Sequence, residues 1–304
     1  MMNLREVLGE AERRRIGLGH FNISDLVALK AVTASARELG LPVLVGVSEG
    51  ERVFVGVRQV AALVESIREE DKQPFFLNAD HTRSLAKAEE AARVGFDMII
   101  FDGSALPFEE NVRQTRQAVQ AVKSINPSII VEGEIGHIGV SSAILERVPE
   151  GMSALTTPEE ARQFVEATTV DVLAPAVGNM HGLLKSMVRG DVKKRLNVTR
   201  IAEIKAATKV FMTLHGGSGT DDGDFQEAIR AGITIVHVNT ELRVAWRRGL
   251  ERALAGAPEE VVPYKLLSEP LAAVKSVVRA RLQLFNFNEG WAEAVRAGSA
   301  ARQA

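Results

Sequence analysis

The chain has 304 residues, of which 46% are hydrophobic and 25% charged, a balance typical of globular proteins and unlike disordered, collagenous or coiled-coil chains. Its net charge of −2 provides no overall positive field for nucleic acid or an anionic membrane, so we expect neither as a partner. The absence of cysteine excludes disulfide scaffolds, thiolate metal sites and cysteine nucleophiles, which leaves any metal to histidine and carboxylate ligands. Residues 1–6 lack the apolar segment of a signal peptide and no apolar run is long enough to cross a bilayer, which predicts a cytoplasmic protein.

Short runs rich in β-branched and aromatic residues recur along the chain, each followed by a turn and a stretch with helical periodicity. This order is typical of βα units in a parallel sheet. The predicted strands are residues 18–22, 42–48, 74–80, 97–102, 128–134, 171–177, 209–215 and 233–239. Because eight such units close a barrel, we expect an α/β fold: a single (β/α)8 TIM-barrel domain over residues 1–304.

The segments between and after these strands carry their own signals. Ser24 precedes the helical stretch 25–39 as a candidate N-cap, and Thr157 precedes a proline and two glutamates, a typical helix start. Residues 136–156 predict a long loop over one barrel face. The apolar spacing in residues 272–284 predicts an extra C-terminal amphipathic helix that packs on the barrel or on a partner subunit.

Polar residues stand at nearly every predicted strand end, which is where (β/α)8 enzymes build their active sites. They are Asn22, Ser48, Glu49, Asp80, His81, Asp102, Glu132, Glu134, Asn179, His181, His215, Asn239 and Thr240.

Three histidines, His81, His181 and His215, come from three different strands and can converge on one ion. A site of three imidazoles with an open position is a common catalytic zinc arrangement, because neutral ligands leave the metal strongly Lewis acidic. A single histidine near a loop is more often just a polar residue. Three at strand ends in a chain without cysteine favour a metal site.

Carboxylates accompany these histidines. Asp80 directly precedes His81. Two interpretations explain this residue about equally well: a general acid/base that acts beside a Lewis acid, or an aspartate in a solvated turn. Glu132 and Glu134 alternate along a strand, so both side chains point to the same side. Two carboxylates inside a barrel are costly unless they meet a cation, which favours a metal or base role.

Glycine-rich turns indicate where an anion would bind. Residues 215–219 read His-Gly-Gly-Ser-Gly, and the loops after the seventh and eighth strands are the usual phosphate site of this fold. Asn239 and Thr240 would complete that site, and residues 178–182 with Lys185 repeat the pattern after the sixth strand. A lone glycine-rich turn is more often a tight connection, and a lone lysine is usually solvated. Jointly, the residues predict a metal-assisted enzyme for a small phosphorylated carbonyl compound.

The same segments, in the same order, resemble those of the class II, metal-dependent ketose-bisphosphate aldolases, the family of fructose- and tagatose-bisphosphate aldolases. The resemblance covers nearly the whole chain, and its specificity lies in the combination of segments. They are Phe21-Asn22-Ile23, Ser48-Glu49-Gly50, Asp80-His81, Asp102-Gly103-Ser104, Val131 to Gly136, Gly178 to Gly182, Leu214 to Gly219 and Val238 to Glu241.

The resemblance implies roles for individual residues. It makes His81, His181 and His215 the ligands of a catalytic Zn²⁺, while Asp102 and Glu134 match the carboxylates that hold the metal in a second, outward position. Asp80 matches the acid/base acting on the C4 oxygen, so no lysine Schiff base is needed. A monovalent cation is a further ligand that the resemblance allows. The residues matched to substrate binding are Asn22, Ser48, Gly182, Lys185, Gly216, Gly217, Ser218, His237, Asn239 and Thr240.

The implied activity is cleavage or formation of fructose 1,6-bisphosphate, with dihydroxyacetone phosphate and glyceraldehyde 3-phosphate as the other reactants. Alternatives are tagatose bisphosphate or a related phosphorylated sugar, and a sugar-phosphate-binding relative without turnover. A third alternative is a metal-dependent hydrolase on the same barrel, but the glycine-rich turn predicted to bind phosphate makes it less favoured. The resemblance also implies a homodimer or homotetramer with the C-terminal helices near the interface.

Three positions depart from the family pattern. Asn78 stands where the family has the first histidine of His-x-Asp-His, and His237 where it has an asparagine. Ser142 occupies the place of a glutamate in the loop after the fifth strand, and Glu146 or Glu150 would have to replace it. The metal site is therefore better supported than the identity of the sugar.

Overall fold

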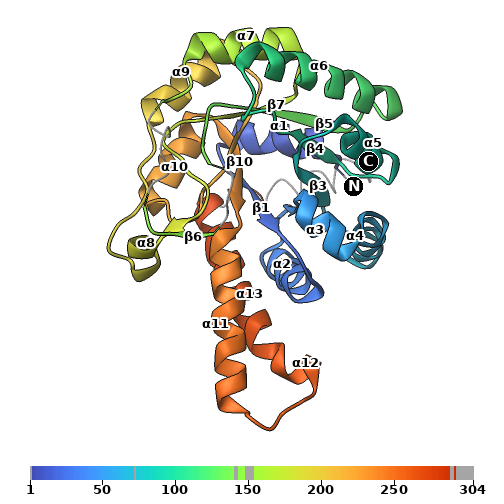
Figure 1. Cartoon of the computed structure of the whole chain (residues 1–304), viewed down its shortest axis with the longest axis vertical. Coiled ribbons are helices and arrows are strands. Elements are labelled where there is room, and N and C mark those ends of the chain that lie inside the picture. Colours follow the sequence, from blue (N-terminus) through green and yellow to red (C-terminus); the bar gives the residue numbers. More distant parts are fainter. Residues whose placement is uncertain (1, 72, 140–142, 148–153, 288–290, 292–304) are drawn as a thin grey trace, which may run out of the picture.

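The computed structural model describes residues 2–71, 73–139, 143–147, 154–287 and 291. Eight parallel strands close into a barrel in the order β1-β10-β9-β7-β5-β4-β3-β2 (Figure 1). They are β1 (Leu18–Asn22), β2 (Val43–Val47), β3 (Phe75–Thr82), β4 (Met98–Phe101), β5 (Ile130–Ile135), β7 (Val172–Pro175), β9 (Phe211–Leu214) and β10 (Ile233–Val238). The eight predicted strands and the TIM-barrel class are confirmed.

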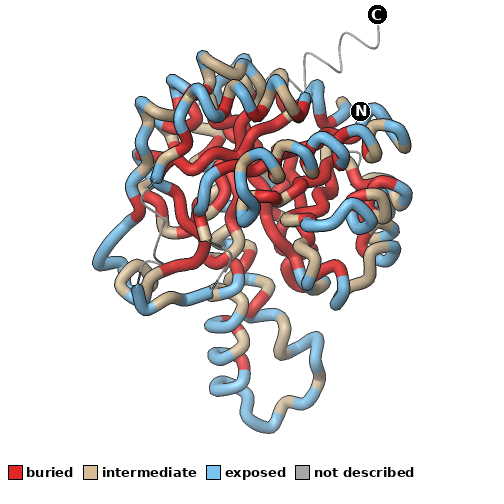
Figure 2. The backbone as a smooth tube through the Cα atoms, turned by 45° about the horizontal axis from the view of Figure 1, so that its top comes forward, coloured by how far each residue is buried: buried red, intermediate tan, exposed pale blue. Residues whose placement is uncertain are grey.

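Helices cover the outside of the barrel, so both faces of each strand are buried (Figure 2). This explains why the strands read as continuous apolar runs rather than as alternating ones. The helices are α1 (Leu4–Arg14), α2 (Leu26–Leu39), α3 (Glu49–Val55), α4 (Val57–Asp71), α5 (Leu85–Arg93), α6 (Phe108–Ile125), α7 (Pro158–Thr168), α8 (Lys185–Arg189), α9 (Val198–Thr208), α10 (Asp222–Ala231), α11 (Thr240–Gly256), α12 (Pro263–Leu266) and α13 (Ser268–Phe285).

Helix capping agrees with the sequence at one site and differs at another. Thr157 caps α7 through a reciprocal pair of bonds with Glu160, as its sequence predicts. The N-cap of α2 is Asp25 and not Ser24: the Asp25 carboxylate accepts the Ala28 N–H at 2.8 Å. Both residue types cap helices well, so the sequence alone does not distinguish neighbours of this kind.

The segment predicted as a long loop contains a short strand. β6 (Ile144–Leu145) pairs in parallel with β8 (Leu183–Leu184), and the two form a small sheet outside the barrel. The loop after β5 is thereby attached to the loop after β7, on the side of the barrel where the strands end. Residues 140–142 and 148–153 of this segment lie outside the described residues.

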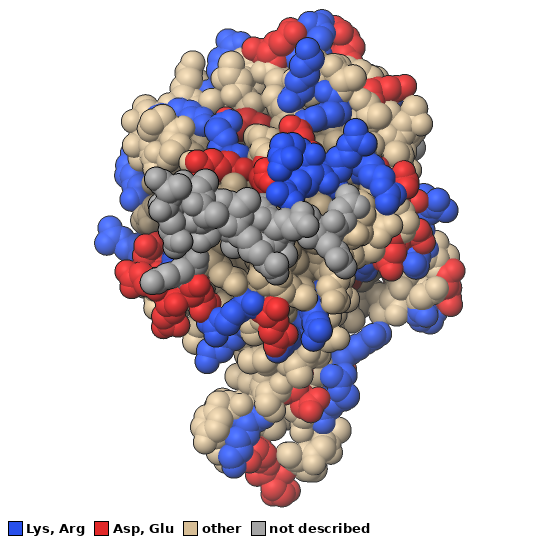
Figure 3. Space-filling view, turned by 180° about the vertical axis from the view of Figure 1, so that it is seen from behind, with Lys and Arg blue, Asp and Glu red and all other residues tan. Residues whose placement is uncertain are grey.

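The predicted C-terminal helix is confirmed as α13. Its buried apolar side includes Val274, Val278 and Leu282, and it packs against α2, α11 and β1. Together α11, α12 and α13 extend away from the barrel, and much of their outer surface is exposed (Figures 1 and 2). Acidic and basic side chains are interspersed on the face shown in Figure 3. Among the described residues, no helix is long and apolar enough to cross a bilayer.

Candidate active site

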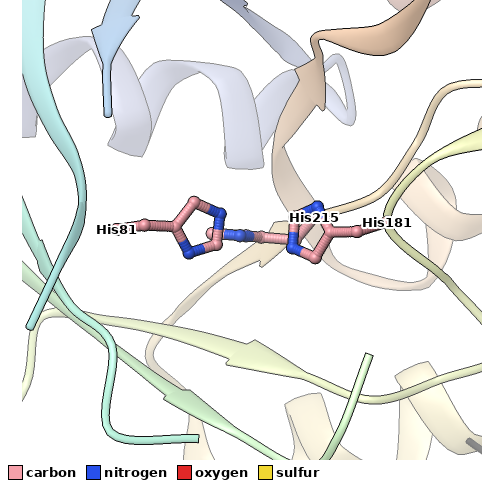
Figure 4. Close-up of side chains that lie close together, drawn as sticks. All are labelled: His81, His181 and His215. Carbon is pink, nitrogen blue, oxygen red and sulfur yellow. The ribbon is translucent and has the colours of Figure 1, made fainter. Parts of the chain in front are cut away.

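His81, His181 and His215 meet at the end of the barrel where the strands finish (Figure 4). His81 lies near the end of β3, His181 in the loop after β7, and His215 directly after β9. One ring nitrogen from each lies within 4.8 Å of the other two. The His181 Nε2 and His215 Nδ1 atoms are buried and have no hydrogen-bond partner within the described structure. Unpartnered nitrogens of this kind fit a bound cation.

Asp102 and Glu134 lie against the same cluster. The His81 Nδ1 atom is 3.1 Å from Asp102 Oδ2 and 3.4 Å from Glu134 Oε2. These three residues form a second group whose ligand atoms are mutually close, and it shares His81 with the first group. The residues predicted to bind metal from the sequence are therefore brought together, in two overlapping groups.

Strong and opposing pKa shifts mark this cluster. Burial would lower the pKa of His81, but the carboxylates of Asp80, Glu134 and Asp102 raise it to about 10. Burial together with the charge of Asp102 raises the pKa of Glu134 to about 7. Burial and the neighbouring imidazoles lower the pKa of His181 well below its ordinary value. Such closely packed titratable groups at a cleft are typical of functional sites.

Glu132 orients one member of the histidine cluster. The His215 Nε2–H donates to Glu132 Oε1 at 2.6 Å, and the hydroxyl of Thr213 donates to the other carboxylate oxygen. This bond directs the opposite nitrogen, His215 Nδ1, to within 3.6 Å of Glu134 Oε2. Both glutamates therefore face the barrel interior, as their alternation predicts. A carboxylate on the far nitrogen of a histidine is the usual arrangement for fixing a metal ligand.

Asp80 is buried, which excludes a solvated turn residue. Its side chain lies beside the histidine cluster, and Asn22 Nδ2 donates to Asp80 Oδ2 at 2.8 Å and to Glu51 Oε2 at 3.0 Å. The other oxygen, Oδ1, accepts no hydrogen bond among the described residues and lies 3.6 Å from His237 Nδ1. Burial raises the pKa of Asp80, but the charge of His81 and its neighbours outweighs it and holds that pKa well below its usual range. Asp80 therefore lines the pocket with one carboxylate oxygen that has no hydrogen-bond partner among the described residues.

Asn78 and His237, two of the positions that depart from the family pattern, both contact His20. The rings of His20 and His237 stack at 3.5 Å with planes 6° apart, and His237 stacks on His215 at 4.2 Å. Asn78 Nδ2 donates to His20 Nε2 at 3.0 Å. Burial lowers the pKa of His20 to about 3. Because the lone pairs of an imidazole lie in its ring plane, parallel stacked rings cannot direct them at one ion, so His20 and His237 do not form a further metal site with Asp80.

The predicted anion-binding residues line a pocket beside the histidines. The pocket contains Asn22, Asp80, His81, His181, Gly182, Gly216, Ser218, His237, Asn239 and Thr240. Within the described structure, the backbone N–H groups of Gly217 and Ser218 donate to no acceptor. The helix α11 begins at Thr240, and the side chain of its N-cap, Asn239, makes no capping bond. A helix N-terminus beside free loop N–H groups is a favourable place for phosphate.

Three predicted binding residues do not line this pocket: Gly217, which follows Gly216 in the same loop, and Ser48 and Lys185, which lie elsewhere. Ser48 caps α3 and lines an outer cleft together with Arg83, Asp102 and Arg243. The Lys185 side chain is 58% exposed and pairs with Glu146 at the surface. The structure therefore does not bring Lys185 to the pocket beside the histidines.

Sequence reasoning missed three residues that hold the site. Lys194 is buried beneath the pocket and donates to backbone carbonyls there. Its neighbours in sequence are Lys193 and Arg195, so it reads as part of an exposed basic run. Arg52 is also buried and donates to the carbonyl of Asp80 and to the hydroxyl of Thr82.

Glu51 is the third residue that sequence reasoning missed, although the sequence around it contains a signal that could have identified it. It joins Asn22 to Arg243 and forms a capping box with Ser48 at the start of α3. The Ser-x-x-Glu spacing is the usual signature of such a box.

Gly216→Ala is expected to weaken phosphate binding by about 5- to 150-fold, because the strain expected at this position is on the order of 1–3 kcal/mol. Gly216 has φ +60°. An added Cβ would lie 2.5 Å from the carbonyl of Met180. Calorimetric titration with inorganic phosphate measures the change.

The matched control is Gly95→Ala, which has φ +92° with no atom within 4 Å of the added Cβ. Phosphate affinity equal to that of the native protein in Gly216→Ala would show that the pocket does not bind phosphate through this loop.

Comparison with known proteins identifies relatives over nearly the whole chain. The family model described as "Fructose-bisphosphate aldolase class-II" matches residues 2–289. A fructose-bisphosphate aldolase of Geobacillus stearothermophilus is 33% identical over 288 residues, which cover 94% of this chain and 96% of that protein. A sulfofructosephosphate aldolase of Alkalicoccus urumqiensis is 31% identical over 281 residues, covering 92% and 95%. The crystal structure of the YdjI aldolase from Escherichia coli K12 has a TM-score of 0.78 at 27% identity, covering 93% and 96%.

Proposed function

The chain belongs to the class II fructose-bisphosphate aldolase family, and we propose on that premise that it is a zinc-dependent aldolase acting on fructose 1,6-bisphosphate. The family is one of metal-dependent lyases that act on phosphorylated sugars, and the resemblance seen in the sequence is confirmed. The observation that carries the proposal is the position of Asp80. Asp80 lines the pocket next to His81 and His181, and one of its carboxylate oxygens accepts no hydrogen bond among the described residues.

The donor set of the cluster fits zinc. Three imidazoles, two of them with buried and unpartnered nitrogens, match the ligand number and type of a catalytic zinc site, with Glu132 supporting His215 from behind. Bound zinc would act as a Lewis acid on the substrate ketone and stabilise the negative charge that C3–C4 cleavage produces. Asp102 and Glu134, with His81, would hold the metal in an outward position.

The residues of the chain itself move the proton and orient the substrate. In cleavage, Asp80 takes the proton from the C4 hydroxyl, and in condensation it returns that proton to the C4 oxygen. Asn22 holds Asp80 Oδ2, so that Oδ1 is left for this transfer. Because its pKa is depressed, Asp80 is ionised at neutral pH, which is the protonation state that a general base needs. The N–H groups of Gly217, Ser218 and the start of α11 would bind the phosphate of the dihydroxyacetone phosphate half.

A second substrate deserves a direct comparison, because a relative of similar identity is named a sulfofructosephosphate aldolase. The outer cleft carries Arg83 and Arg243, whose cations suit a second anionic group of either kind, phosphate or sulfonate. Tagatose bisphosphate remains a further alternative, as does binding without turnover. Ser142 and Glu150 lie outside the described residues, while Glu146 is exposed and pairs with Lys185.

The test is release of dihydroxyacetone phosphate, measured in a coupled assay with fructose 1,6-bisphosphate, tagatose 1,6-bisphosphate and sulfofructose 1-phosphate. We expect cleavage of the first to be fastest, to stop after EDTA treatment and to return with zinc or cobalt. Faster cleavage of another sugar would show that the assigned substrate is wrong, and activity that survives complete metal removal would exclude the zinc mechanism. Phosphate binding without any cleavage would identify a binding protein.

We propose further that residues 1–304 act as one barrel domain in a cytoplasmic homodimer or homotetramer. The extension formed by α11, α12 and α13 supports the assembly, because Val261 and Tyr264 lie on it with 84% and 77% of their surface exposed. Exposed apolar side chains on a projecting element are typical of subunit interfaces.

A further inference from the structure

A single ammonium group joins the two loops that form the phosphate pocket. Lys194 lies between α8 and α9, and only 5% of its surface is exposed. Its Nζ donates to the carbonyls of Met180 at 2.6 Å, Gly182 at 2.7 Å, Gly216 at 3.0 Å and Ser218 at 2.5 Å. The first two carbonyls belong to the loop after β7 and the last two to the loop after β9.

The surroundings of this ammonium resemble the binding site of a free cation. A lysine is almost never fully buried unless a carboxylate pairs with it, yet the described hydrogen-bond partners of Lys194 Nζ are all backbone carbonyls. A cage of backbone carbonyls is the environment that monovalent cations such as K⁺ prefer. Burial lowers the pKa of Lys194 to about 7, against an opposing effect of Glu241, which itself pairs with Arg281.

The same bonds decide which way the pocket's N–H groups point. In a trans peptide, the carbonyl of one residue and the N–H of the next point in opposite directions. The Gly216 carbonyl points at Lys194, so the N–H of Gly217 points away from it and donates to no acceptor in the described structure. Gly182, Gly216 and Ser218 also line the pocket. In its protonated form, Lys194 therefore orients the loop and places a positive charge behind the site where phosphate would bind.

We propose that Lys194 is a positioning residue whose ammonium takes the place of a free monovalent cation beneath the phosphate pocket, so that phosphate binding needs no added K⁺ or Na⁺. The inference rests on the proposed function only in taking this pocket as a phosphate site, and it does not depend on aldolase turnover.

The experiment uses the full-length, zinc-loaded protein and three variants: Lys194→Ala, Lys194→Met and the control Lys193→Ala. Lys193 is the adjacent residue, half-exposed and paired with Asp221 at the surface. Affinity for inorganic phosphate and the melting temperature are measured in tetramethylammonium chloride, KCl and NH₄Cl at equal ionic strength.

We expect the native protein and Lys193→Ala to bind phosphate equally well in all three salts. Lys194→Ala should lose about 10- to 100-fold in phosphate affinity in tetramethylammonium chloride, because a bonded charged group is lost. KCl or NH₄Cl should restore much of that affinity and raise the melting temperature, since the vacated space is surrounded by carbonyls. Lys194→Met should show the loss without the rescue, because its side chain fills the space.

Three results would overturn the inference. They are native phosphate binding that requires K⁺, unchanged affinity in Lys194→Ala, and a folded Lys194→Ala whose lost affinity no cation restores. If Lys194→Ala does not fold, the inference is tested by the salt dependence of phosphate binding in the native protein and by the phosphate affinity of Lys194→Met. A native protein that binds phosphate independently of K⁺ but cleaves no sugar would contradict the proposed aldolase activity and leave this inference standing.

Discussion

Asp80→Asn should lower kcat by about 10²- to 10⁴-fold, the usual contribution of a general acid/base. The amide has nearly the same shape as the carboxylate and can still accept the bond from Asn22, but it cannot take up the C4 proton. Because Asp80 lies beside the histidines without being one of the three, zinc content should stay at the native level. Steady-state rates of dihydroxyacetone phosphate release, with metal analysis of the same sample, check both statements.

A control for that variant is Glu51→Gln, which also alters a carboxylate bonded to Asn22 but leaves Asp80 in place. It should reduce kcat far less than Asp80→Asn. A variant Asp80→Asn with native kcat and full zinc content would exclude Asp80 as the proton-transferring group.

His181→Ala should remove both the metal and the activity. Only two of the three imidazoles would remain, and the loss of Lewis-acid stabilisation, several kcal/mol, should lower kcat by on the order of 10³-fold or more. Zinc content after dialysis and cleavage of fructose 1,6-bisphosphate are measured together. The matched control is His137→Ala, since His137 is the one histidine outside the buried site and is exposed on the loop after β5.

Retention of one tightly bound zinc in His181→Ala would show that the cluster holds its metal through the other group, His81 with Asp102 and Glu134. Activity that fell equally in His137→Ala would point to general damage to the protein rather than to a lost ligand.

The barrel and most of the site could be predicted because each depends on a local pattern. Buried parallel strands read as apolar runs, and the fold places the residues after those runs at one end. His81, His181 and His215 are therefore found by position alone, although the first and the last lie 134 positions apart in the sequence. The pairing of β6 with β8 involves two residues on each strand, too few to leave a periodic signal.

Other features depend on contacts between distant segments and carry no local signal. The polar residue Asn78 within β3 and the substituted His237 make sense only once His20 is seen to contact both. Lys194 is missed because a buried lysine and a solvated one look the same in sequence, and only the folded loops show four carbonyls around its ammonium.

The closure of the barrel between β1 and β10 bears on how the protein is made. His20 on the first strand lies opposite His237 on the last, so the two strands meet only after the whole barrel has been synthesised. A nascent chain ending before residue 233 already contains all three clustered histidines, but β1 still has one unpaired edge, and the start of α11, which lines the pocket beside them, does not yet exist. We therefore expect the complete site to form only after the last strand and α11 have been synthesised, rather than gradually as the barrel grows.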